Sequence, residues 1–137
     1  MIGIVIAAHS RLGEALVEAA EFILGTQPQG VVPVSIDLNE SAEKLIEKIT
    51  QGIQAVDNNH GVLILTDMFG GTPSNLSYSF LEEGRIEVLS GVNLPVLIKA
   101  LNSRPEMALE DLAKHLEAYG RKSISLASGI LKGNKRS

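Results

Sequence analysis

The chain alternates short, continuous apolar runs with longer stretches in which apolar positions recur every three or four residues. The runs at residues 2–8, 31–36 and 61–66 are rich in Val, Ile and Leu, which is typical of strands covered on both faces. Residues 85–91 predict a short fourth strand. We place residues 2–8 in the first, central strand, and Pro33 favours a position near a sheet edge for the second strand.

The stretches between the runs predict amphipathic helices. Ser10 is placed to cap the first helix and Gly25 to end it. The apolar face of this helix consists of Leu12, Ala15, Leu16, Ala19, Ala20, Ile23 and Leu24. Asn39 or Ser41 opens a second helix. Its inner face consists of Leu45, Ile46, Ile49, Ile53 and Val56.

Further helices are predicted in the second half of the chain. Thr72 followed by Pro73 is typical of an N-cap with proline in the first helical position, and we expect that helix to run to about Glu83. Residues 94–103 and 105–120 predict two more helices, because their apolar positions follow a helical period.

Strands that alternate with helical stretches predict βαβ units and an α/β fold. We expect one domain, residues 1–130, with an open, doubly wound, mainly parallel sheet and helices on both faces. We interpret residues 123–131 (SISLASGIL) as a last strand and residues 131–137 as a polar, frayed tail. In such sheets ligands bind at the carboxyl ends of the strands, where the strand order changes direction. His9 and Asp67 are therefore expected at the same edge.

Composition and charge narrow the function classes. The chain has 12 basic and 16 acidic side chains, a formal charge of -4, and no face-wide cluster of Lys or Arg, so we expect no nucleic-acid partner. The absence of cysteine leaves no disulfide framework and no thiolate metal site. The first apolar run ends at Ala8, too early for a signal peptide or a membrane span. We therefore expect a cytoplasmic protein without direct membrane insertion.

His9 follows the first predicted strand, and its chemistry suits phosphoryl transfer. A neutral imidazole nitrogen is abundant at pH 7 and can attack a phosphoryl group, which it then holds as a phosphoramidate. The second ring nitrogen needs a partner that fixes the tautomer and stabilises the positive charge. Asp67 follows the third strand and is in position for that role, so both residues are candidate catalytic residues.

A transferred phosphoryl group also needs hydrogen-bond donors for its oxygens. Gly70 and Gly71 allow the backbone to turn N–H groups toward an anion, and the helix that begins near Pro73 adds its positive end. Thr72 adds a hydroxyl. Ser10 is foremost a helix cap, and beside the site its hydroxyl could also reach the phosphate. The stretch TDMFGGTPSN therefore predicts a histidine partner followed by a phosphate cradle.

Other sites of known chemistry are not indicated by motifs. The sequence contains no GxxxxGKS/T, GxGxxG or GxSxG, so a P-loop, a dinucleotide site and a hydrolase nucleophile elbow are not supported. His60 and His115 have no metal-ligand spacing with the carboxylates, and we interpret them as a turn residue and an outer-face helix residue. We expect no metal and no cofactor.

Three motifs occur in order along the chain: AAHS, which ends the first strand, TDMFGGTPSN after the third, and SGVNLPVLIKAL after the fourth. Together they resemble the enzyme IIA proteins of the mannose class of the bacterial phosphoenolpyruvate-dependent sugar phosphotransferase system, from Met1 to about Ile130. The resemblance implies that His9 takes a phosphoryl group from the phosphocarrier protein HPr and gives it to a IIB protein or domain during sugar uptake. It also implies a homodimer in which a terminal strand crosses between subunits; we assign residues 123–131 to that strand, which could run antiparallel.

The resemblance also suggests individual roles. Asp67 is the partner of His9, and Thr72 stands where the family often has a serine that touches the phosphate. Phe69 stands where some members have tryptophan, which alters the rim of the site more than its chemistry. The GVNLP segment closes one wall of the site, to which we assign Asn93 and Pro95. The sugar is not readable from this chain, because specificity in the family is expected to lie in the membrane components.

Other functions stay open. In a receiver-like module Asp67 would accept the phosphoryl group with magnesium, although Ala7, Ala8 and His9 stand where the acidic metal ligands would be. A flavodoxin-like binding module would want a larger apolar pocket, and aromatic residues are only 4% of the chain. The phosphoryl-donor subunit of bacterial dihydroxyacetone kinases shares the histidine but differs in the third-strand motif. A role in reporting phosphorylation state also stays open.

Overall fold

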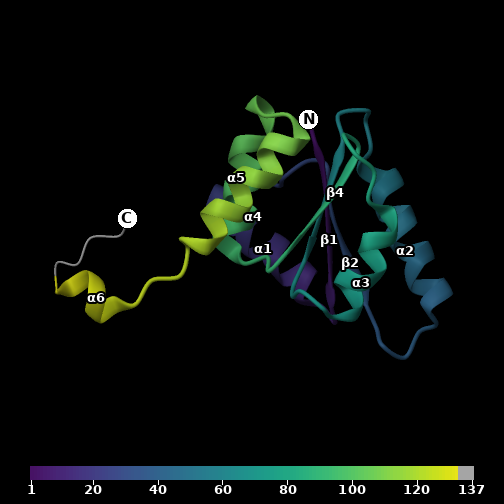
Figure 1. Cartoon of the computed structure of the whole chain (residues 1–137), viewed down its shortest axis with the longest axis horizontal. Coiled ribbons are helices and arrows are strands. Elements are labelled where there is room, and N and C mark those ends of the chain that lie inside the picture. Colours follow the sequence, from purple (N-terminus) through teal and green to yellow (C-terminus); the bar gives the residue numbers. More distant parts are fainter. Residues whose placement is uncertain (133–137) are drawn as a thin grey trace.

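The computed structural model describes residues 1–132, in which strands and helices alternate along the chain (Figure 1). The strands are β1 (Gly3–His9), β2 (Val31–Ile36), β3 (Val62–Thr66) and β4 (Ile86–Ser90). The α-helices are α1 (Leu12–Leu24), α2 (Ala42–Val56), α3 (Thr72–Ser77), α4 (Leu94–Ser103), α5 (Leu109–Arg121) and α6 (Ala127–Leu131). The 3-10 turns η1 (Tyr78–Phe80) and η2 (Arg104–Glu106) follow α3 and α4. None of the helices in residues 1–132 is long and apolar enough to cross a membrane.

The described residues form one four-stranded sheet in the order β2-β1-β3-β4, and every neighbouring pair of strands is parallel. The predicted α/β fold, the central position of β1 and the edge position of β2 are confirmed. Pro33 is tolerated in β2 because an edge strand has one row of backbone groups without strand partners. The chain moves from β1 to β2 on one side and to β3 on the other, so the strand order changes direction between β1 and β3.

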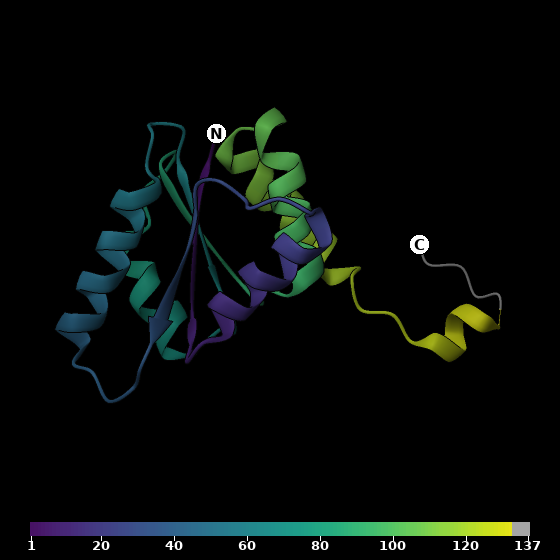
Figure 2. The same cartoon turned by 180° about the vertical axis from the view of Figure 1, so that it is seen from behind.

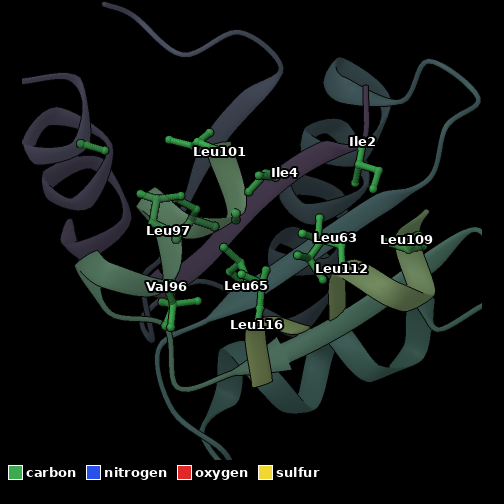
Figure 3. Close-up of a cluster of buried hydrophobic side chains, with 14 of the residues drawn as sticks. Ile2, Ile4, Leu63, Leu65, Val96, Leu97, Leu101, Leu109, Leu112 and Leu116 are labelled. Atoms are coloured by element: carbon green, nitrogen blue, oxygen red, sulfur yellow. The ribbon is translucent and has the colours of Figure 1, made fainter. Parts of the chain in front are cut away.

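Helices cover both faces of the sheet, as predicted. Helices α1, α4 and α5 lie on one face, and α2 and α3 lie on the other (Figures 1 and 2). Alternate residues of β1 point to opposite faces, so Ile4 joins the core under α4 and α5, and Val5 joins the core under α2. Figure 3 shows the core under α4 and α5, in which Leu97 of α4 and Leu116 of α5 gather with Leu65 of β3. Burial of this apolar surface holds α4 and α5 against the sheet, in which the backbone ladder pairs β1 with β3.

The junction between β1 and α1 differs from the prediction. Ser10 does not cap α1, because Arg11 takes the N-cap position and makes no side-chain cap hydrogen bond. Ser10 instead has φ 53°, in the left-handed region, where the chain turns from strand to helix. The predicted signals at the end of α1 and at the start of α2 are confirmed. Gly25 ends α1 with φ 73°, and the Ser41 hydroxyl accepts the Lys44 N–H at 3.1 Å to cap α2.

The helix predicted from Thr72 to about Glu83 is shorter in the structure. Gly71 takes the N-cap position, Thr72 is already helical, and α3 ends at Ser77. The Ser77 hydroxyl donates to the Pro73 carbonyl at 2.6 Å, a type of bond that competes with the regular helix pattern. The 3-10 turn η1 then leads the chain toward β4.

The predicted last strand is wrong for the single chain. Residues 123–126 belong to no strand or helix, and the following residues form α6, which stands away from the body of the molecule (Figure 1). A strand needs a partner for its backbone groups, whereas a short helix satisfies them locally. Ile124 and Leu126 remain 82% and 76% exposed. Residues 133–137, which form most of the predicted tail, lie outside the described residues.

Candidate active site

The strand order brings two polar side chains to the place where it changes direction. His9 is the last residue of β1, and Asp67 directly follows β3. The ladder between these strands pairs Ala7 with Thr66, so both side chains leave the sheet at nearly the same level. The structure brings them together: His9 Nδ1 lies 2.8 Å from Asp67 Oδ2.

Asp67 holds His9 through its backbone as well as its ring. Its Oδ2 accepts the His9 backbone N–H at 3.0 Å, and its Oδ1 accepts the Met68 N–H at 3.0 Å. Because a carboxylate only accepts hydrogen bonds, Nδ1 carries the proton in this pair and Nε2 keeps a lone pair. The side chain of Asp67 is 11% exposed and that of His9 is 32% exposed. The accessible side of the pair is therefore the imidazole.

The same contacts determine the charge of Asp67. Burial alone would raise the pKa of its carboxyl group, because burial disfavours the charged form. Hydrogen bonds from the His9 backbone and ring, together with the positive charge that His9 can carry, outweigh burial and hold the pKa of Asp67 below its usual value. Asp67 is therefore ionised at neutral pH and can stabilise positive charge on the imidazole.

Gly71 lies against the open edge of the imidazole. A Cβ added at this position would lie 3.0 Å from His9 Cε1 and 3.6 Å from His9 Nε2. The φ of Gly71 is −83°, a value open to any residue, so the site needs glycine for space rather than for conformation. The missing side chain leaves Nε2 accessible.

The backbone N–H groups of the predicted phosphate cradle differ in whether they already make a hydrogen bond. Gly70 has φ 86°, and its N–H donates to the Ser74 hydroxyl at 3.0 Å, so this residue shapes the turn and its donor is engaged. Across residues 1–132, no hydrogen bond occupies the N–H groups of Gly71 and Thr72. Thr72 is half-buried at the start of α3. One of these two N–H groups belongs to Gly71, which lies against His9, and the other belongs to the next residue.

A groove opens beside His9 on the side of β2. It has a volume of about 440 Å³ and is lined by His9, Ser10, Arg11, Ser35, Ile36, Asp37 and Leu38. Ser10 is exposed; its N–H donates to the Ile36 carbonyl at 3.1 Å, and its carbonyl accepts the Ser35 hydroxyl. Sequence reasoning missed Ser35, because its contact depends on the register that pairs β2 with β1 and leaves no local signal.

Phe69 lies at the rim of the site. Its side chain is 78% exposed, and its ring centroid is 6.3 Å from that of Tyr78. Its neighbour Met68 is 54% exposed, and Leu38, which lines the groove, is 63% exposed. Single apolar residues on a surface are ordinary, but several around one reactive side chain indicate a contact surface for another molecule.

The GVNLP segment is fixed to β3 and to the helices that follow it. The N–H groups of residues 91 and 92 both donate to the Thr66 carbonyl at 2.9 Å. Asn93 caps α4 by accepting a backbone N–H at 2.9 Å, and its amide donates to the Ser123 hydroxyl at 2.9 Å. Pro95 is exposed in the first turn of α4. The segment therefore links the end of β3 to the beginning of residues 123–131, which we call the C-terminal arm.

The other two histidines of the chain have different surroundings. His60 precedes β3, at the opposite end of that strand from Asp67, and its Nδ1 lies 3.1 Å from Asn58 Oδ1 in an exposed turn. His115 is half-buried in α5. In the part of the chain that the structure describes, no group of three or more His, Asp or Glu side chains could hold a metal ion.

Known proteins share this sequence pattern and fold. Residues 3–117 match the family model EIIA-man, described as the PTS system fructose IIA component, where PTS is the phosphotransferase system. The chain is 36% identical over 129 residues to the PTS system fructose-specific EIIA component of Bacillus subtilis, covering 93% of this chain and 88% of that protein. It is 38% identical over 125 residues to the PTS system mannose-specific EIIAB component of Escherichia coli K12, covering 90% of this chain but only 38% of that longer protein.

A solved structure agrees with these matches. The phosphotransferase system component EIIA from Streptococcus agalactiae superposes with a TM-score of 0.83 at 29% identity, covering 93% of this chain and 98% of that chain. The matched part of this chain includes both His9 and Asp67. The chain therefore belongs to the EIIA-man family and is an EIIA phosphocarrier of sugar uptake, a phosphotransferase component of the phosphotransferase system.

Proposed function

We propose that His9 carries the phosphoryl group and that Nε2 is its reactive atom. The contact with Asp67 carries this proposal, because Nδ1 is engaged with Oδ2 at 2.8 Å and Nε2 is left to attack. Nε2 attacks the phosphorus of the donor, and the new N–P bond forms as the bond between phosphorus and the donor atom breaks. The proton stays on Nδ1, where the negative charge of Asp67 offsets the positive charge of the ring.

We assign the oxygens of the transferred group to donors around Gly71. The N–H groups of Gly71 and Thr72 have no other hydrogen bond in the described residues, and the Thr72 hydroxyl adds a third donor. Ser10 offers a hydroxyl from the groove side, and Gly70 gives the turn its shape. Such donors suit a loose, metaphosphate-like transition state, which needs positioning and neutralisation more than covalent help.

Membership of the family implies two protein partners that act in turn: HPr as phosphoryl donor and a IIB protein or domain as acceptor. Both must reach Nε2, and two features support this: the imidazole is accessible, and Phe69, Met68 and Leu38 expose apolar surface near it. Transfer between these carriers places the protein in the cytoplasm in this proposal. The relatives carry different sugar names, fructose and mannose, so the sugar stays unassigned.

We also propose a homodimer in which residues 123–131 of one subunit pair, antiparallel, with β4 of the other. Strand β4 is at the edge of the sheet, and beyond Ile86, which pairs with Glu82, its outward backbone groups have no strand partner in residues 1–132. Grooves of about 250 Å³ and 170 Å³ lie between β4 and α5. Ile124 and Leu126 would become buried there. The five-residue helix α6 is too short to be stable by itself, so it offers little resistance to this change.

Phosphorylation chemistry tests the proposed carrier residue. The protein is incubated with phosphoenolpyruvate, enzyme I and HPr, alongside His9→Ala and the matched control His60→Ala. We expect a label that is lost in acid, survives alkali, is absent from His9→Ala and is retained in His60→Ala. An alkali-labile label that persists in His9→Ala and disappears in Asp67→Asn would assign the chemistry to Asp67 instead. No label, with a control acceptor phosphorylated, would overturn the proposal.

A further inference from the structure

The Ser35 hydroxyl, which takes no part in the proposed transfer chemistry, holds the loop that follows His9. Ser35 lies in β2, paired with Ala8, and its hydroxyl donates to the carbonyl of Ser10. The N–H of Ser10 donates back to the Ile36 carbonyl at 3.1 Å. Hydrogen bonds on both sides of Ser10 therefore join the end of β2 to the residue next to His9.

These bonds act on a strained backbone. Ser10 has φ 53°, and among the described residues other than glycine only Asn59 shares a positive φ. Asparagine tolerates the left-handed region better than serine does, so Ser10 needs support from its surroundings. The hydrogen bonds at its N–H and its carbonyl supply that support. Without the bond at the carbonyl, the peptide after Ser10 is free to relax toward the right-handed region.

Ser35 is itself anchored by α2, a helix that covers one face of the sheet. The ammonium of Lys48, in α2, donates to the Ser35 carbonyl and lies 2.8 Å from Glu40 Oε1. The Lys48 side chain is 26% exposed, and these two partners accept hydrogen bonds from its ammonium group. Contacts thus run from α2 through β2 to Ser10. They reach β1 from the side opposite to β3 and Asp67.

We propose that Ser35 is a positioning residue for phosphoryl transfer: its hydroxyl keeps Ser10 in the left-handed conformation, so that His9 is held from β2 as well as from β3. Asp67 orients the ring through Nδ1, and Ser35 fixes the backbone from which the ring extends. The inference rests on the proposed role of His9. Because small displacements of a reacting atom slow a transfer strongly, loss of the Ser35 hydroxyl is expected to cost about tenfold in rate.

The test follows rapid transfer of the phosphoryl group from phospho-HPr over a range of HPr concentrations. Ser35→Ala should lower the maximal rate about tenfold and leave the half-saturating HPr concentration unchanged. Ser35→Thr keeps the hydroxyl and should restore most of the rate. Ser79→Ala is the matched control, since it removes a hydroxyl that donates to the Leu76 carbonyl at 2.7 Å in η1. It should transfer like the wild type.

A second background isolates the backbone mechanism. Glycine accepts φ 53° without strain, so in Ser10→Gly the further change Ser35→Ala should slow transfer by only about twofold. Equal losses in both backgrounds, or a wild-type rate in Ser35→Ala, would overturn the inference. An unlabelled wild type, or a label retained by His9→Ala, would instead overturn the proposed role of His9. The two failures are therefore distinguishable.

Discussion

At the scale of single residues, the site gives the two nitrogens of one imidazole unlike surroundings. Nδ1 of His9 faces the Asp67 carboxylate at 2.8 Å, whereas Nε2 faces the space that Gly71 leaves open. One nitrogen can therefore keep the proton while the other carries the phosphoryl group. The ring needs no reorientation between receiving the group and passing it on.

Asp67→Asn tests the charge in this arrangement. Asparagine keeps the size of the side chain and an oxygen that can accept from Nδ1, but it removes the negative charge that offsets the charge on the ring. We expect phosphorylation of His9 to slow on the order of 10²-fold, measured as single-turnover transfer from phospho-HPr. Wild-type transfer by Asp67→Asn would show that the carboxylate charge is not used.

The lowered pKa of Asp67 also predicts how stability depends on pH. Its folded pKa lies below the unfolded value of about 3.9, so the stabilisation is complete above that pH and is lost as the pH falls through the folded pKa. In urea unfolding at a series of pH values, the wild type should therefore lose more stability than Asp67→Asn below about pH 4. Parallel curves for the two proteins would contradict this linkage.

Gly71→Ala tests the space beside Nε2. The added Cβ would lie 3.0 Å from His9 Cε1, closer than such contacts normally come, so the imidazole or the turn must shift. We expect phosphorylation to slow by about tenfold or more in a transfer assay. Gly129→Ala is the matched control, because a Cβ at that position meets nothing within 4 Å. Equal rates for Gly71→Ala and the control would mean that this space is not needed.

At the scale of elements, strong apolar periodicity made β1 to β4 and the longer helices predictable. The meeting of His9 and Asp67 was predictable too, because the carboxyl ends of parallel strands share one edge. The boundaries at Ser10 and Thr72 were missed, since both residues have cap propensities that the tertiary turn overrides. The contact between Ser35 and Ser10 depends on strand register, which local patterns do not reveal.

A buried arginine joins the elements at the end of the sheet away from His9, and the sequence pattern did not reveal it. Arg104, in η2, is 5% exposed, and its Nη1 donates to the Ile2 and Gly30 carbonyls at 3.1 and 3.3 Å. Its Nη2 donates to the Gln29 carbonyl. Burial lowers its pKa, and in residues 1–132 its Nε has no hydrogen-bond partner. One side chain thus ties the start of β1 to the loop before β2.

Arg104→Met should lower the free energy of unfolding by roughly 1–3 kcal/mol, because buried carbonyls lose their donor. Urea unfolding measures this change. Arg121→Met, at a side chain that is 77% exposed and paired with Glu117, is the control and should change stability by less than about 1 kcal/mol. Equal effects of the two substitutions would contradict the bridging role of Arg104. His9 should still be phosphorylated in the folded Arg104→Met protein, since Arg104 lies away from the site.

At the scale of the whole molecule, the end of the sheet that carries His9 and Asp67 is connected to the C-terminal arm, which we propose to pair with the edge strand β4. The Thr66 carbonyl, next to Asp67, accepts two N–H groups of the GVNLP segment, and Asn93 of that segment donates to the Ser123 hydroxyl. Residue 123 is also where the exposed apolar arm begins. The arm therefore starts from a fixed point beside the sheet, as the proposed pairing with β4 of a second copy of the chain requires.

Shortening the chain to residues 1–122 tests this assembly. It removes the arm but keeps every described strand and α1 to α5, so we expect a folded monomer, whereas the full chain and residues 1–132 should sediment as dimers. His9 and Asp67 come from one subunit, so the monomer should still accept a phosphoryl group. A dimer of residues 1–122 would move the interface to another surface, such as α1, where Phe22 and Ile23 are 88% and 55% exposed. A monomer that cannot be phosphorylated would instead mean that assembly completes the site.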